Sequence, residues 1–193
     1  MNAPNSPSYV SRGGEKLAFA LDRFRLDIDG CVCADLGSHV GGFVDCLLQR
    51  GARRVYAVDT AYGTFAWRLR RDSRVVVLER TNAMHVALPE PVDLVTIDVG
   101  WTPQARILPN AAGMIKPGGR VVTLIKPHYE AARDLLRDGV LPEESLADVA
   151  RSVTQSMTAM GWVVGGETRS PIRGHGGNAE FLVLLTRADG PVE

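Results

Sequence analysis

Four charged residues stand where the sequence predicts strands or helices to begin or end: Lys16, Asp98, Lys126 and Glu180. Their charges alternate in sign along the chain, and opposite charges share a cleft at a lower desolvation cost than charges of one sign. A lysine amine in such a cleft can take a proton when it is neutral, or stabilise an oxyanion when it is charged. The four residues therefore indicate proton transfer or oxyanion stabilisation, although each alone could be a solvated charge at the end of an element.

Lys126 is the most distinctive of these positions. It ends the apolar run at residues 121–125 and precedes Pro127, which restricts the residue before it to an extended backbone. A strand that ends here carries the amine to the edge of a sheet, where α/β proteins bind their ligands. A lysine that only caps the strand end is the alternative.

A glycine-rich turn, GSHVGG, follows the first predicted strand at residues 37–42. Glycines here let the backbone approach a ligand, and the next helix presents its N-terminus to that ligand. Asp59 ends the second strand about 20 residues after Gly37, where an acid can hold ribose hydroxyls. The turn indicates a nucleoside site, and a turn that serves only packing is the alternative.

Asp35, at the tip of the first strand, narrows the class of ligand. An acid at this place repels a pyrophosphate but suits an ammonium or sulfonium group, so it favours S-adenosylmethionine over NAD. The phosphate-binding motif GxxxxGK followed by Ser or Thr is absent, which argues against ATP. Asn82 follows the third strand and could bond an adenine edge. The predicted cofactor residues are Asp35, Gly37, Ser38, Gly41, Gly42, Phe43, Asp59, Asn82 and Asp98.

Apolar runs of strand length alternate with helical patterns along most of the chain. Strands are predicted at residues 31–36, 53–59, 74–79, 92–98, 120–126, 162–169 and 180–187. Helices are predicted from Gly14 and at residues 43–50, 62–72, 104–114 and 142–161. Helical crossovers imply parallel strands, whereas the loop before the last strand allows a hairpin, so this strand is predicted to be antiparallel. The pattern predicts an α/β fold with an open, doubly wound, Rossmann-like sheet.

The composition is typical of a globular domain, with 193 residues, of which 45% are hydrophobic and 23% charged. We predict a flexible lead at residues 1–12, one domain at 13–188 and a tail at 189–193. The 22 basic and 22 acidic residues cancel, so contact with RNA requires a local patch. Candidates for this patch are Arg12, Arg169 and Arg173, for which an ordinary surface role is the alternative.

Neither the cysteines nor the histidines are spaced like a disulfide framework or a metal site. The three cysteines are interpreted as reduced core residues, and the four histidines lack ligand spacing, so no metal is predicted. The N-terminus has no signal-peptide core, and the longest apolar runs are too short to span a bilayer. These features predict a cytoplasmic protein without a membrane contact.

Four stretches of the sequence resemble a known family: YVSRGGEKL at 9–17, GGFVDCLLQRGARRVYAVD at 41–59, YGTFAWRLRRDSRVVVLERTN at 62–82 and GNAEFLVLL at 177–185. They are similar to the FtsJ-like RNA ribose 2′-O-methyltransferases, and most of all to the TlyA (haemolysin A) branch. The resemblance implies a class I methyltransferase fold with a seven-stranded sheet and S-adenosylmethionine as methyl donor. It also implies RNA as acceptor, in particular ribosomal RNA or a ribosomal subunit, and a catalytic tetrad of Lys16, Asp98, Lys126 and Glu180.

The chemistry of this family gives each member of the tetrad an expected role. A ribose hydroxyl is a poor acid, so its oxygen needs assistance to attack a sulfonium methyl group. We predict that Lys126 is the base or the oxyanion stabiliser and that Asp98 orients it. Lys16 and Glu180 are expected to position the substrate, and no metal is required.

The sequence departs from the TlyA branch in two places. That branch normally carries an N-terminal S4 RNA-binding domain, and this chain begins where that domain would end, so RNA affinity is expected from the predicted arginines or from a protein partner. After Asp98 the chain reads VGWTPQ instead of an apolar, serine-rich segment, and Trp101 is expected to pack at the sheet edge rather than stack on a base. Two other functions stay open: a non-catalytic RNA-binding assembly factor that binds S-adenosylmethionine, and a methyltransferase for a small molecule or a protein.

Overall fold

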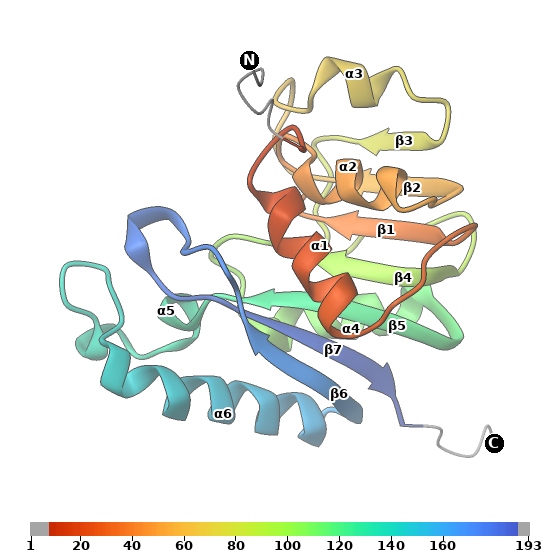
Figure 1. Ribbon diagram of the computed structural model, residues 1–193. Helices are drawn as coiled ribbons and strands as arrows, with labels where there is room; N and C mark the ends of the chain where they lie inside the picture. Colours follow the sequence, from red (N-terminus) through yellow and green to blue (C-terminus); the bar gives the residue numbers. More distant parts are fainter. Residues whose placement is uncertain (1–7, 189–193) are drawn as a thin grey trace.

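A computed structural model describes residues 8–188, apart from the side chain of His175 (Figure 1). The helices are α1 (Gly13–Arg23), α2 (Gly42–Gln49), α3 (Trp67–Arg70), α4 (Gln104–Met114), α5 (Pro127–Glu130) and α6 (Glu143–Ala159). The strands are β1 (Val32–Leu36), β2 (Arg54–Val58), β3 (Val75–Leu78), β4 (Val92–Ile97), β5 (Ile115–Ile125), β6 (Trp162–Arg169) and β7 (Phe181–Arg187). Two 3₁₀ turns, η1 (Arg133–Leu135) and η2 (His175–Gly177), lie between them.

The strands form one seven-stranded sheet in the order β3-β2-β1-β4-β5-β7-β6. Strands β1 to β5 pair in parallel, and β7 is antiparallel to both of its neighbours. The order reverses between β1 and β4, because the chain builds outward from β1 to β3 and then returns to the other side. The predicted doubly wound sheet with an antiparallel last strand is confirmed.

Helices cover both faces of this sheet and give the domain three layers (Figure 1). One hydrophobic cluster joins α1 and α2 to one face through side chains such as Leu17, Leu21 and Leu47. A second cluster joins α4 and α6 to the other face through Ile107 and Met157 among others. Strands that are buried on both faces read as continuous apolar runs, which explains the sequence pattern from which they were predicted.

Two elements differ from the sequence prediction. The helix predicted at 62–72 is a single turn at 67–70, because Gly63 has a φ of +76° and Ala66 is extended, which places Phe65 in the core. Strand β5 begins before the expected residue 120. Ile115 pairs with Val92 and Arg120 with Leu94, so the intervening KPGG segment bulges out of the strand.

The chain after Lys126 forms the short helix α5 and then the turn η1, in a region where no helix or strand is predicted. Pro127 occupies the first position of α5, where its missing N–H costs no hydrogen bond. Lys126 itself is extended, with φ −110° and ψ 90°. The expected end of the strand at the lysine is therefore confirmed.

Part of the expected lead is packed against the domain. Tyr9 and Val10 contact the cluster under α1 and α2, and the Val10 N–H donates to Asp45 Oδ2 at 2.8 Å. Residues 1–7 of the lead and the predicted tail at 189–193 lie outside the described residues, and the domain limits stay a prediction. Within residues 8–188, no helix is long and apolar enough to cross a membrane, and no group of three metal-ligating side chains is placed to hold an ion.

Candidate active site

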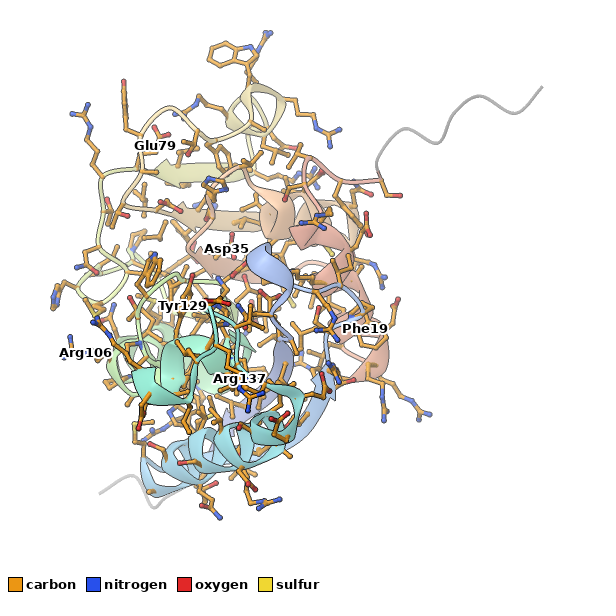
Figure 2. The ribbon with its side chains drawn as sticks, turned by 90° about the vertical axis from the view of Figure 1, so that its left-hand side faces the viewer. Phe19, Asp35, Glu79, Arg106, Tyr129 and Arg137 are labelled. Atoms are coloured by element: carbon orange, nitrogen blue, oxygen red, sulfur yellow. The ribbon has the colours of Figure 1, made fainter. Side chains whose placement is uncertain are left out.

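The candidate site lies at the edge of the sheet where β1, β4 and β5 end. Gly37, Asp98 and Lys126 are the residues that follow these three parallel neighbours. Open α/β sheets bind ligands at this edge, at the point where the strand order reverses, which here is between β1 and β4. Figure 2 looks onto the edge and shows Asp35 and Tyr129 near its middle.

Lys126 and Asp98 form the first charged pair of the site. The Lys126 ammonium lies 2.6 Å from Asp98 Oδ1 and donates a hydrogen bond of 3.2 Å to the Val99 carbonyl. Asp98 Oδ1 is buried and has no aligned hydrogen-bond donor in the described part of the chain, so its contact with the ammonium is a charge–charge contact rather than a directed hydrogen bond. The amine is thus held at the strand end by two oxygens from the segment that follows β4.

Lys16 and Glu180 form the second pair, from α1 and from the residue before β7. The Lys16 ammonium donates to Glu180 Oε2 at 2.5 Å, and the two side chains are only 12% and 3% exposed. Burial raises the pKa of Glu180 above its ordinary value, and the bond from Lys16 opposes this shift. The charges of Asp98 and Lys126 also act on Glu180, so the two pairs lie within electrostatic reach of each other.

Two adjoining cavities open beside these pairs. The first, of about 340 Å³, is lined by Lys126, Asp59 and Asn82 among others, and the second, of about 330 Å³, by Lys16, Asp35 and Phe43 among others. Gly37, His39 and Asp98 line both. Glu180 does not line either cavity, and it bonds to Lys16, which lines the second.

The backbone geometry at Gly37 explains why this position of the turn requires a glycine. Its φ is +91°, and a Cβ at this position would stand 2.5 Å from the carbonyl oxygen of Asp98. Gly41 also has a positive φ, of +100°, and begins α2, but it packs against Phe65 and lines neither cavity. The buried Ser38 hydroxyl donates to the Asp35 carbonyl at 2.9 Å, so it stabilises the turn.

Asp35 has an unusual environment for a carboxyl group. It is fully buried, its Oδ1 accepts a hydrogen bond of 2.7 Å from Thr96, and its Oδ2 has no hydrogen-bond partner among residues 8–188. Burial raises the pKa of Asp35 to about 7, against the effect of the Thr96 bond. A buried acid with a free oxygen at a cavity fits a ligand that brings a cation or a hydrogen-bond donor.

Asp59 and Asn82, which were predicted to hold ribose and adenine, border the first cavity. Asp59 accepts the backbone N–H of His39 and of Ala61, each at 2.7 Å, and each carboxylate oxygen keeps a further lone pair. Asn82 Oδ1 accepts the Met84 N–H at 2.9 Å, which orients the side chain and leaves its amide hydrogens for a ligand.

The predicted arginines do not form one patch. Arg12 lines the second cavity, whereas Arg169 makes two bonds of 2.5 and 2.9 Å to Glu143 at the start of α6. Arg173 lies 3.6 Å from the same carboxylate and donates to the Gly177 carbonyl. The charges of Arg169 and Arg173 are therefore partly neutralised.

Trp101 contradicts the expectation that it packs at the sheet edge. Its side chain is 83% exposed, and its ring centroid lies 4.6 Å from that of Tyr129 on α5. A polar loop, GWTPQ, surrounds Trp101 in the sequence and could have indicated its exposure. Nothing in the sequence indicated that Tyr129 would meet it.

The strand order, the reversal point and the acid at the tip of β1 define a class of protein, the class I methyltransferases with a Rossmann-like fold. Solved methyltransferases with only 16% identity share this fold, with TM-scores of 0.65 and 0.64. The model of the FtsJ-like methyltransferase family matches residues 9–187, and the chain belongs to this family.

Proteins with a higher sequence identity show which members of the family this chain resembles. The chain is 40% identical to 16S/23S rRNA (cytidine-2′-O)-methyltransferase TlyA of Mycobacterium tuberculosis, over 94% of this chain and 70% of that one. It is also 40% identical to YqxC of Bacillus subtilis, named a candidate rRNA methyltransferase, over 94% of this chain and 66% of the relative. A solved structure described as a candidate hemolysin from Streptococcus thermophilus is 38% identical, with a TM-score of 0.92 over 98% of this chain and 70% of its own. The chain thus spans about two thirds of the length of these relatives.

Proposed function

We propose that this chain transfers a methyl group from S-adenosylmethionine to a ribose 2′-hydroxyl of ribosomal RNA. The observation that carries the proposal is the Lys126–Asp98 pair, 2.6 Å apart, beside the glycine turn that follows β1. Membership of the FtsJ-like family supports methyl transfer, and the name of the mycobacterial relative supports ribosomal RNA as the acceptor.

The residues of the two cavities suit the proposed donor. Asp59 and Asn82 would hold the ribose and adenine in the first cavity, and the free oxygen of Asp35 would face the cationic part of the donor. When bound, S-adenosylmethionine supplies an electrophilic methyl group on a sulfonium centre.

Lys126 is proposed to act on the acceptor hydroxyl. Its ammonium group lies 2.6 Å from Asp98 Oδ1 and donates one of its three N–H groups to the Val99 carbonyl. An N–H that is not used by Val99 would donate to the ribose oxygen and stabilise the negative charge that develops there. If the amine is neutral when the acceptor binds, the same geometry lets it take the hydroxyl proton.

Lys16 and Glu180 are proposed to position the acceptor. Their bond of 2.5 Å is nearly excluded from water, which strengthens it and fixes the Lys16 side chain at the wall of the second cavity. Arg12, which lines the same cavity, is proposed to contact an RNA phosphate.

The test is methyl transfer from a labelled donor to ribosomal RNA isolated from cells that lack the gene. Lys126→Ala should reduce kcat about 1000-fold, because both proton transfer and oxyanion stabilisation are lost. Affinity for S-adenosylmethionine, measured by calorimetry, should change little, because Asp35, Asp59 and Asn82 remain. Transfer that persists in the variant at the wild-type rate would refute the role of Lys126.

Lys116→Ala is the matched control. Lys116 lies near the start of β5, whereas Lys126 follows its end, and Lys116 pairs with Asp93 while half exposed. Its removal should leave kcat unchanged. Wild-type protein that binds the donor but labels no RNA would contradict the proposed reaction and favour a non-catalytic factor, and a labelled small molecule or protein would indicate a different acceptor.

A further inference from the structure

The loop after β4 exposes an aromatic side chain in a strained conformation. Trp101 is 83% exposed, more than Trp67 at 69% or Tyr62 at 67%, and its φ is +59°. A bulky residue with a positive φ is uncommon, and such residues concentrate at functional sites. Burial in the core does not explain a tryptophan here, and the backbone conformation does not favour one.

Trp101 is not isolated, because it stacks on Tyr129. The ring centroids are 4.6 Å apart, and the planes meet at 30°, which is the geometry of a tilted stack. Tyr129 belongs to α5, and its backbone N–H donates to the Lys126 carbonyl at 2.8 Å. The Lys126 ammonium lies 5.9 Å from the Tyr129 ring centroid. The aromatic pair is therefore fixed to the residue that carries the proposed chemistry.

A second contact holds the two segments together. The Gln104 N–H, at the start of α4, donates to Glu130 Oε1 on α5 at 2.8 Å. Burial raises the pKa of Glu130, and the Gln104 bond opposes the shift. The Trp101 loop and α5 are thus tied on both sides of the stacked rings, which lowers the entropy that a ligand would lose on binding there.

The pair stands at the rim of the first cavity. Gly100 and Thr102, on either side of Trp101, line that cavity together with Asp98 and Lys126. Figure 2 shows Tyr129 near the middle of the carboxyl-terminal edge and Arg106 on the same side of the molecule. An acceptor whose ribose oxygen reaches Lys126 would bring its neighbouring groups to these rings.

We infer that Trp101 and Tyr129 form a stacking platform for a nucleobase of the acceptor RNA. The inference rests on the proposed function, because it takes the acceptor to be RNA. Every base has a π-face, and stacking on aromatic side chains is the usual way in which proteins hold unpaired bases. A base held at the rim must be unstacked from its neighbours, so the platform selects a single-stranded or flipped-out nucleotide.

The kinetic test is Trp101→Ala in the methyl-transfer assay. Loss of one stacked ring should raise KM for the RNA about tenfold, with kcat and affinity for S-adenosylmethionine nearly unchanged. Trp101→Phe should recover most of the loss, because a smaller ring still stacks. Trp67→Ala, which removes a similarly exposed tryptophan on α3, is the control and should leave KM unchanged. An unchanged KM in Trp101→Ala would overturn the platform while leaving the proposed reaction intact.

A binding test separates the platform from catalysis. In a Trp67→Phe background the remaining tryptophans are Trp101 and the buried Trp162, so short single-stranded oligocytidylate should quench the emission of Trp101. An oligonucleotide of the same length without bases should not quench it. The quenching should persist in Lys126→Ala. Quenching without any methyl transfer would refute the proposed reaction but support the platform, and equal quenching by both oligonucleotides would refute the platform.

Discussion

The two lysine pairs at the carboxyl-terminal edge and the arginine pairs between α6 and β6 use similar groups in opposite ways. Lys16 and Glu180 are 12% and 3% exposed, whereas Arg169 and Glu143 are 43% and 59% exposed. Exposed pairs contribute little to stability, but a buried pair must compensate for the cost of removing charges from water. The lysine pairs therefore occupy an environment that stability alone does not favour, as expected of residues retained for chemistry.

The buried pairs at the candidate site and the exposed surface pairs also differ in their basic residue, which is lysine at the site and mostly arginine on the surface. Lys16, Lys116 and Lys126 are the only lysines among 22 basic residues, and two of the three lie at the candidate site. Arginine makes most of the surface pairs, including those with Glu143. Because a guanidinium group stays protonated in proteins, only a lysine can serve as a base, and a compact ammonium also fits beside a single ribose oxygen.

The largest effect that would test this comparison is expected from Glu180→Ala. It leaves the Lys16 ammonium buried without its partner, and we expect a loss of about 3 kcal/mol in the free energy of unfolding. Glu180→Gln, which keeps the shape and one acceptor, should lose about half as much. Urea unfolding measures both. A loss below that of Glu143→Ala would show that the buried pair is no different from the exposed one.

An intermediate effect is expected from the titration of Asp35. Its pKa is raised from 3.8 to about 7, so between these values the folded state holds a proton that the unfolded state releases. The stabilisation is therefore complete below pH 3.8 and is lost as the pH rises towards 7. Asp35→Asn should remove this part of the slope of stability between pH 3.8 and about 7, read as melting temperature. If the melting temperature changed with pH equally in the wild-type protein and in Asp35→Asn, the raised pKa of Asp35 would be refuted.

The same variant tests what the acid is for. Asp35→Asn should bind S-adenosylmethionine much more weakly, because a neutral amide offers no charge to a cationic ligand. In the wild-type protein the ligand should raise the melting temperature most clearly above pH 7, where Asp35 is ionised. If calorimetry gave the wild-type protein and Asp35→Asn the same affinity for S-adenosylmethionine, Asp35 would not be a cofactor-binding residue.

The smallest effect is expected from Arg169→Ala. The pair with Glu143 is exposed, so its loss should change the free energy of unfolding by less than about 0.5 kcal/mol. KM for RNA should also change little if Glu143 neutralises the arginine. Arg12→Ala, which removes the cation that lines the second cavity, should raise that KM instead, and the opposite order would reinstate Arg169 as an RNA contact.

The parts of the fold and site that depend on local sequence could be predicted. Apolar runs fixed the strands, and the end of a strand placed Asp35, Asp98 and Lys126 at one edge of the sheet. Pro127 predicted the extended backbone at the lysine. These features depend on a few adjacent residues and on the rule that parallel strands end together.

The remaining features depend on distant contacts. Lys16 and Glu180 are 164 positions apart, and they were expected to meet because of a family resemblance rather than any spacing. The stack of Trp101 on Tyr129 requires the loop after β4 to meet helix α5, and no local pattern encodes that contact. Helix α3 was overestimated because Gly63 and Ala66 leave the helical conformation to bury Phe65.

The close approach of Gly37 to Asp98 has a mechanical consequence. The backbone of the turn after β1 touches the carbonyl of the acid that holds Lys126, with no space for even one methyl group between them. A displacement of the turn towards β4 would therefore press on the backbone of Asp98, whose carboxylate contacts Lys126.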